Sequence, residues 1–206
     1  MRFSQPLDDL LQSRSHVRVL RALVGLPDEI DSSVREIARR AGVTHPTASS
    51  VLEGLRQQGV VRVRRTLLSD EYRLNTQHAL SDEIRSLFDL EMQVRTDLRE
   101  LLTSEILTSA PWVTEASLFG SFVRDEMLPN SDLDLALISP PGKVAKLGVI
   151  IEDLSNATVQ RFGNPIHAVM GRASIQAMAQ PGVKGYRLWK TIAKEGIPLI
   201  RAGKKA

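Results

Sequence analysis

Hydrophobic residues in the first third of the chain recur at helical spacing, and turn-forming residues interrupt them. Ser32 or Ser33 can cap the second of these segments and Gly42 can end it, while Thr44 or His45 can cap the third. The pattern predicts three short helices, at residues 16–24, 34–41 and 45–59. It then predicts two short strands, at residues 60–63 and 71–74, with residues 64–70 as the loop between them.

The remainder of the chain has two further patterns, and Pro111 separates them. Residues 76–108 carry apolar side chains three and four positions apart, which predicts one long helix. Beyond Pro111, short apolar runs alternate with helical segments, as in an α/β or α+β domain. The expected strands are 116–119, 133–138, 166–170 and 197–200, and the expected helices are 144–161 and 186–194.

Composition narrows the class of protein. A chain of 206 residues is long enough for one large or two small domains. It contains no cysteine, which excludes disulfides and thiolate metal sites. The first 20 residues lack the apolar run of a signal peptide, and no segment has the length of a membrane span. We therefore expect a cytoplasmic protein with no membrane partner.

The distribution of positive charge is more informative than the net charge of +3. No lysine precedes Lys143, so the N-terminal part uses arginine alone, and Arg62, Arg64 and Arg65 cluster there. A guanidinium group donates hydrogen bonds in a bidentate fork that suits phosphates and base edges. Charge alone leaves two interpretations open, a nucleic-acid surface and a solvated arginine-rich surface.

The first motif is a short helix, a tight turn at Gly42 and a second helix that opens at Thr44. Residues 14–75 resemble the winged helix-turn-helix of bacterial and archaeal regulators, including the ending at residues 72–75. The resemblance implies double-stranded DNA as a partner, because the second helix of such a motif enters the major groove. It implies groove-facing roles for His45, Thr47, Ser49 and Ser50, and phosphate or minor-groove contacts for Arg62, Arg64 and Arg65. The alternative for His45 is a solvent-exposed residue at a helix N-terminus.

The second motif begins where the apolar run 116–119 ends, at Gly120 and Ser121. We expect a helix to begin at Phe122 and to continue to about Met127. Glycine lets backbone approach a phosphate closely, and a helix N-terminus supplies N–H donors. The Ser121 hydroxyl can add a further hydrogen bond. This turn is therefore a candidate phosphate-binding loop.

Paired carboxylates, Asp132 and Asp134, stand at the start of the strand 133–138. Residues two apart on a strand share a face, so both carboxylates can hold Mg²⁺ on a nucleoside triphosphate. The alternative is a turn whose aspartates only cap local backbone. Ser131 can brace this turn, and Arg124 can meet a phosphate or pair with a nearby carboxylate.

The spacing of Gly-Ser, Arg124 and Ser-Asp-x-Asp resembles the minimal nucleotidyltransferases of the polymerase-beta-like superfamily, over about residues 110–201. The resemblance implies a nucleotide site of Gly120, Ser121, Arg124 and Ser131, metal ligands Asp132 and Asp134, and a catalytic set of Asp132, Asp134 and His167. Active members use a third carboxylate on a later strand, but residues 164–170 contain no Asp or Glu and His167 takes that place. Histidine is a poor ligand for Mg²⁺. It can act as a base near neutral pH, or it is a polar residue left at a degenerate site.

The expected fold is therefore two-domain α+β. We expect a winged helix-turn-helix at residues 1–75, a connecting helix at 76–108, and a nucleotidyltransferase-fold mixed sheet with helices at 109–206. The leading hypothesis is a DNA-binding transcriptional regulator whose C-terminal domain binds a nucleotide or a related ligand. The alternative is an active Mg²⁺-dependent enzyme that transfers NMP from an NTP to a protein or small-molecule acceptor. A third hypothesis is that this chain is the antitoxin-like partner of a toxin protein. The long helix either pairs in a homodimer or packs only on its own two domains.

Overall fold

The computed structural model describes residues 7, 10–67 and 69–201. The ends of the first and last expected domains, residues 1–6 and 202–206, lie outside this range. Contacts divide the chain between Gln93 and Val94 into two compact units. Helix α5 (Ser81–Ser109) contributes its first half to one unit and its second half to the other. Within the described range, no helix is both long and apolar enough to cross a membrane.

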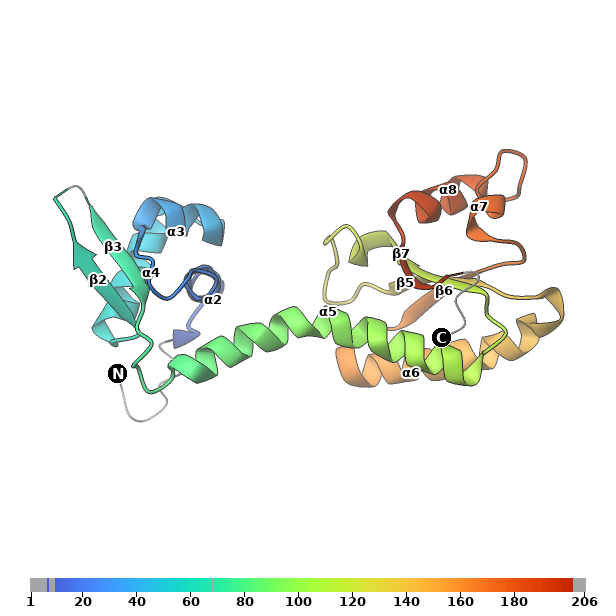
Figure 1. The fold of residues 1–206 in the computed structure, drawn as a ribbon, viewed down its shortest axis with the longest axis horizontal. Coiled ribbons are helices and arrows are strands. Elements are labelled where there is room, and N and C mark those ends of the chain that lie inside the picture. Colours follow the sequence, from blue (N-terminus) through green and yellow to red (C-terminus); the bar gives the residue numbers. More distant parts are fainter. Residues whose placement is uncertain (1–6, 8–9, 68, 202–206) are drawn as a thin grey trace. The chain divides into compact units, whose positions relative to one another are not determined.

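The first unit combines short helices with a small antiparallel sheet (Figure 1). Its helices before α5 are α2 (Arg14–Val24), α3 (Val34–Ala41) and α4 (His45–Gln57), and its strands are β1 (Ser32–Ser33), β2 (Val61–Arg65) and β3 (Asp70–Leu74). The strands pair in the order β1-β3-β2. This arrangement confirms the expected helix-turn-helix with two strands behind it.

The turn between α3 and α4 is fixed by local hydrogen bonds. The Ser33 hydroxyl accepts from the Glu36 N–H at 3.3 Å, and the Thr44 hydroxyl accepts from the Thr47 N–H at 3.4 Å. Gly42 ends α3 in the left-handed conformation with φ 61°, which glycine adopts without a steric penalty. Ser33 and Thr44 are thus the capping residues among the alternatives that the sequence offers.

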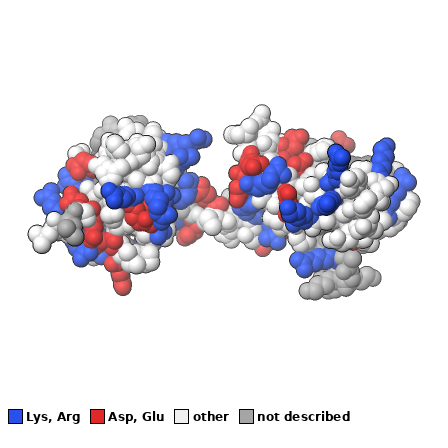
Figure 2. Space-filling view, turned by 90° about the horizontal axis from the view of Figure 1, so that it is seen from above, with Lys and Arg blue, Asp and Glu red and all other residues white. Residues whose placement is uncertain are grey.

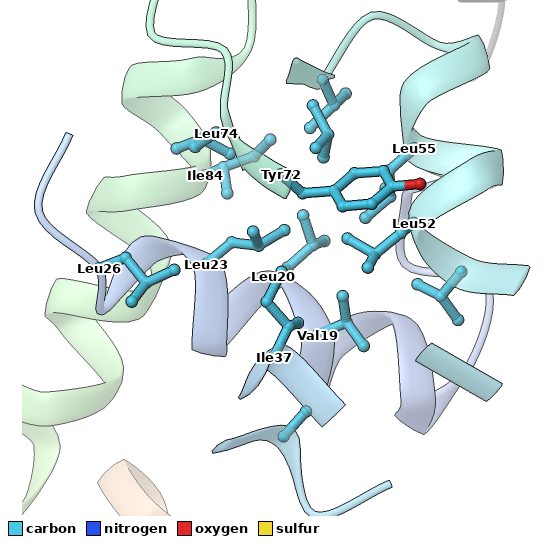
Figure 3. Close-up of a cluster of buried hydrophobic side chains, with 14 of the residues drawn as sticks. Val19, Leu20, Leu23, Leu26, Ile37, Leu52, Leu55, Tyr72, Leu74 and Ile84 are labelled. Atoms are coloured by element: carbon cyan, nitrogen blue, oxygen red, sulfur yellow. The ribbon is translucent and has the colours of Figure 1, made fainter. Parts of the chain in front are cut away.

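A single aliphatic core holds the elements of the first unit together (Figure 3). Its buried members include Leu20 and Leu23 of α2, Ile37 of α3, Leu52 and Leu55 of α4, Tyr72 and Leu74 of β3, and Ile84 of α5. Because α4 buries this one face, its opposite face and its N-terminal turn are left toward solvent.

One expectation about the sheet of the first unit is wrong, and one of its strands was not predicted. Arg64 and Arg65 lie inside β2, where they pair with Glu71 and Asp70, and not in the loop between the strands. The hairpin closes later than expected because the Thr66 N–H donates to the Ser69 carbonyl at 3.1 Å. The additional strand β1, which pairs with β3, was not predicted, since two residues are too few to show a period.

The second unit is a mixed sheet with helices on both faces (Figure 1). Its strands are β4 (Glu115–Phe119), β5 (Leu133–Ile138), β6 (Ile166–Gly171) and β7 (Ile197–Ile200), in the order β6-β5-β4-β7. Its helices after α5 are α6 (Val144–Phe162), α7 (Ile175–Met178) and α8 (Tyr186–Glu195). Strands β5 and β6 run parallel, whereas β4 is antiparallel to β5 and β7.

Alternation along β5 assigns its side chains to the two faces of the sheet. Leu133, Leu135 and Leu137 are buried against α5 and α6, while Ala136 and Ile138 join the smaller core beneath α7 and α8. Asp134 has the parity of the second set. The candidate carboxylate therefore lies on the α8 face, where the strand begins.

The helix that we expected to begin at Phe122 is absent. A short 3-10 turn (Gly120–Phe122) replaces it, because Asp125 enters the left-handed region at φ 57°. The Glu126 N–H then donates back to the Ser121 carbonyl at 2.9 Å, which closes the turn in the manner of a helix C-terminus. Arg124 consequently lies in this closed turn and not on the first turn of a helix.

Other differences in the helices are smaller. Helix α5 begins at Ser81 and not at residue 76, because Asn75, His78 and Ser81 form successive turns through backbone hydrogen bonds of 3.0 and 2.9 Å. The short helix α7 and a 3-10 turn (Pro141–Lys143) were not predicted. Both are too short for an apolar period to identify them.

Candidate functional site

The Gly120 turn directly follows β4 and lies against the side chain of Asp134. Gly120 has a φ of 73°, a conformation that favours glycine. A Cβ atom at this position would come within 2.9 Å of the Asp134 Cγ atom and overlap its carboxylate. Two independent features therefore require glycine at this position, the backbone conformation and the close approach of the Asp134 carboxylate.

Asp134 and His167 are neighbours across the parallel strands β5 and β6. The register pairs the two residues directly, and the His167 Nδ1 atom lies 3.1 Å from the Asp134 Oδ1 atom. The His167 side chain is 61% exposed and the Asp134 side chain 27%, so the pair is reachable from solvent. Asp132 precedes β5 by one residue, shares the parity of Asp134 and is exposed. The sequence thus identified residues that the sheet brings together.

The donor set fits a divalent cation only in part. Asp132 and Asp134 offer oxygen atoms, which Mg²⁺ prefers, but the third side chain is an imidazole. Within the described range, no group of three His, Asp or Glu side chains is arranged to hold a metal ion. A cation at this edge would take its protein ligands from the two aspartates and the rest from phosphate oxygens and water.

Ser131 stabilises the loop before β5. Its hydroxyl accepts a hydrogen bond from the Leu128 N–H at 2.9 Å, so Ser131 braces this loop. Asn164 supports the same loop by donating from Nδ2 to the carbonyl of Ser131 at 2.8 Å and to that of Pro129 at 3.4 Å. The sequence did not identify Asn164, because this contact joins segments more than 30 positions apart.

Arg124 is held by carboxylates of its own unit. Its Nε atom donates to Glu126 at 2.8 Å, and its terminal nitrogen lies 3.7 Å from Glu195 at the end of α8. The hydrogen bond to Glu126 raises the pKa of Arg124 above its ordinary value, with Glu195 contributing in the same direction. By contrast, the Ser121 hydroxyl makes no hydrogen bond within the described part of the chain. Of the polar side chains on this turn, Ser121 is free to meet a ligand.

The N-terminal turn of α4 is the exposed part of the helix-turn-helix. His45 and Ser50 are exposed, while Thr47 and Ser49 are half-buried. The Thr47 hydroxyl also lies 2.8 Å from the Thr44 hydroxyl, so it belongs in part to the cap of the helix. Among the residues that the sequence places in the groove, His45 and Ser50 are thus the most accessible.

The three arginines of β2 differ in their partners. Arg64 pairs with Asp31 at 2.7 Å and with Glu71 at 2.5 Å, and Arg62 donates to Gln77 at 2.8 Å. Arg65 forms no ion pair or hydrogen bond with any side chain that the structure describes. Two of the three predicted phosphate contacts are therefore already occupied within the unit.

Arg35 was not identified from the sequence but lies beside the predicted interface. It is exposed in the first turn of α3 and forms no ion pair among residues 10–67 and 69–201. With His45 and Ser69 it lines a hollow of about 420 Å³ between the start of α3, the start of α4 and the hairpin. On the face seen in Figure 2, basic and acidic side chains are interspersed in both units.

Two family models match the chain. Residues 13–66 match the MarR family, and residues 91–167 match the nucleotidyltransferase domain. The chain joins a MarR-type winged helix to a nucleotidyltransferase domain. The second match begins inside α5, ahead of Val94, and ends at His167.

Three solved structures resemble this chain, each of them only weakly. A toxin–antitoxin crystallised with AMP-PNP is 14% identical over 51% of this chain and 74% of its own, with a TM-score of 0.35. A homodimeric winged helix-turn-helix DNA-binding domain from Mycobacterium bovis, a possible ArsR-family regulator, is 25% identical over 47% and 88%, with a TM-score of 0.31. PigF with SAH is 20% identical over 88% and 65%, with a TM-score of 0.29. Scores this low support no conclusion about this chain, and no curated protein matches it.

Proposed function

We propose that the protein is a DNA-binding transcriptional regulator whose C-terminal domain binds a nucleotide. The observation that carries the proposal is the exposed N-terminal turn of α4, where His45 lines a hollow with the unpaired Arg35. Arg65 on β2 is a second exposed arginine of this unit without an ion pair in the described residues. A helix N-terminus of this kind enters the major groove, and exposed arginines without ion-pair partners can supply phosphate contacts. Residues 13–66 also match the MarR family.

Binding to the DNA upstream of the protein's own gene tests this part of the proposal. Fluorescence anisotropy with a labelled duplex is repeated between about 50 and 200 mM salt, and the logarithm of the affinity falls linearly with the logarithm of the salt concentration. A variant with His45→Ala and Ser50→Ala loses preference for that duplex over a scrambled one. Absence of salt-sensitive binding by the wild-type protein contradicts the proposal.

The nucleotide is assigned to the edge of the sheet at Gly120, Asp132 and Asp134. Gly120 and the free Ser121 hydroxyl provide a turn that a phosphate can approach, and the two aspartates provide the oxygen ligands for its Mg²⁺. Titration calorimetry with ATP and Mg²⁺ tests the assignment. The pair Asp132→Asn and Asp134→Asn abolishes Mg²⁺-dependent binding, whereas Asp153→Asn on the exposed face of α6 leaves it intact. Equal binding by both variants contradicts the assignment.

Nucleotidyl transfer is a second candidate, and the position of His167 favours it. An exposed imidazole 3.1 Å from Asp134 is placed to accept the proton of an attacking hydroxyl group or amine. Incubation with labelled NTP, Mg²⁺ and cell extract detects transfer to an acceptor. Labelling of an acceptor by the wild-type protein that is lost in His167→Ala supports this function. The absence of labelling by the wild-type protein contradicts it.

A further inference from the structure

A side chain of helix α5, Arg95, contacts the turn that follows Gly120. The terminal nitrogen Nη2 of Arg95 donates to the Phe122 carbonyl at 3.0 Å, and the other terminal nitrogen forms an ion pair with Asp125. The guanidinium group also lies over the Phe122 ring, 4.5 Å from its centroid. Three contacts from one arginine thus meet the two residues that shape the end of this turn.

Asp125 is the point at which the turn reverses. It is the non-glycine residue with a positive φ in the described part of the chain, at 57°. L-residues populate this region sparsely, so surrounding contacts have to maintain it. The reversal directs the Glu126 N–H to the Ser121 carbonyl at 2.9 Å, which connects Asp125 to the backbone of the candidate phosphate turn.

A purely structural role for this ion pair predicts small effects. The Arg95 side chain is 46% exposed and that of Asp125 is 75% exposed, and exposed ion pairs contribute little to stability. A role in positioning predicts something different, a change at Gly120 and Ser121 without a comparable change in the thermal unfolding temperature. The two roles can therefore be separated by experiment.

We propose that Arg95 is a positioning residue of the nucleotide site. From α5 it fixes the Phe122 carbonyl and the left-handed Asp125, so that the backbone N–H groups and the hydroxyl at Gly120 and Ser121 remain directed toward a bound phosphate. This inference rests on the proposed nucleotide binding. It makes the second half of α5 part of the site, on the same helix whose residues Ile84 and Phe88 are buried in the core of the first unit.

Calorimetric titration of the full chain with ATP and Mg²⁺ tests the proposal. Arg95→Gln weakens binding roughly tenfold, as expected for the loss of charge-assisted hydrogen bonds. Arg95→Lys, which keeps the charge but loses the fork, recovers part of the affinity. Arg99→Gln is the matched control, because Arg99 lies one turn later on α5, is exposed and has no ion pair within the described range. It leaves the affinity within about twofold of wild type.

A second readout does not depend on nucleotide. In ¹⁵N-labelled protein without ATP, Arg95→Gln shifts the amide resonances of Gly120 and Ser121, and Arg99→Gln does not. Asp125→Asn removes the carboxylate partner but keeps a residue that tolerates the left-handed region. It produces a smaller loss of affinity than Arg95→Gln, because the contacts of Arg95 with Phe122 remain. In the Arg95→Gln background it adds little further loss, because the ion pair is already absent.

The outcomes distinguish the inference from the proposed function. If wild type binds ATP and Arg95→Gln binds it equally well, the positioning role is wrong and nucleotide binding stands. If wild type does not bind ATP, both fall. If Arg95→Gln lowers the unfolding temperature substantially, Asp125→Asn decides, and unchanged affinity in that variant overturns the positioning role.

Discussion

The two candidate interfaces of the molecule use their charged side chains differently. In the first unit, Arg35 and Arg65 have no ion-pair partner in the described residues, so a phosphate would meet them without breaking an ion pair. At the candidate nucleotide turn (residues 120–126 and the start of β5), the polar side chains are bonded to one another, as in the Asp134–His167 pair at 3.1 Å and the Arg124–Glu126 ion pair at 2.8 Å. Substitutions at the DNA interface should therefore be nearly additive, and those at the nucleotide turn should not.

The largest expected effect is at Gly120, where the coupling is tightest. Gly120→Ala places a methyl group on the Asp134 carboxylate and forces an L-residue into a left-handed conformation that costs roughly 1–2 kcal/mol. We expect nucleotide affinity to fall about tenfold in calorimetry, because a turn that relieves this strain leaves the conformation that a phosphate meets, and about 1–2 kcal/mol corresponds to roughly five- to thirtyfold. DNA affinity should be unchanged.

Gly142→Ala is the matched control for this change. Gly142 lies in the same unit, and a Cβ atom there meets nothing within 4 Å. An equal loss of nucleotide affinity in both variants, or none in Gly120→Ala, would show that the turn does not contact the nucleotide.

An intermediate effect is expected where the arginines are free. Arg35→Gln and Arg65→Gln should each weaken DNA binding several-fold. Each should also reduce the magnitude of the negative slope of log affinity against log salt by about one, as for the loss of one phosphate contact. Together they should lower it by about two. Arg64→Gln should change the slope less, because Asp31 and Glu71 already neutralise that guanidinium group.

Anisotropy titrations over a salt series give all of these slopes. Should Arg64→Gln lower the slope as much as Arg65→Gln does, the ion pairs of Arg64 open on binding DNA. The contrast between free and coupled charges would then not hold for the first unit.

The sequence predicted local features well and long-range ones poorly. Helix caps, the left-handed Gly42 and the alternation of β5 follow from neighbouring residues, and so they were predictable. The resemblance to the nucleotidyltransferases placed His167 in the same site as Asp134, and the register of β5 and β6 pairs the two residues. The closed turn at Asp125 was not, since it depends on Arg95, which lies 30 positions earlier. Arg64 was placed in a loop because Asp31, its partner, is equally remote in the sequence.

The smallest expected effect concerns an ion-pair cluster within helix α3 of the first unit. Glu36 on α3 accepts hydrogen bonds from Arg39 at 2.8 Å and from Arg40 at 2.7 Å. These bonds, with that from Arg39 the larger, lower the pKa of Glu36 from 4.5 to about 2. A carboxyl group with a lowered pKa stabilises the folded state above its unfolded pKa, and this contribution is lost as the pH falls from about 4.5 to about 2.

Glu36→Gln should remove that dependence, so the thermal midpoint of the variant should fall less than that of wild type between pH 5 and pH 2.5. The difference should be small, because the carboxylate is accessible to solvent, which screens the pair. Glu83→Gln is the control, since Glu83 is exposed on α5 and has no ion pair within the described residues. Nucleotide affinity at neutral pH should be the same in all three proteins. A loss confined to Glu36→Gln would mean that this ion pair is coupled to the nucleotide turn, and the two interfaces would no longer be independent.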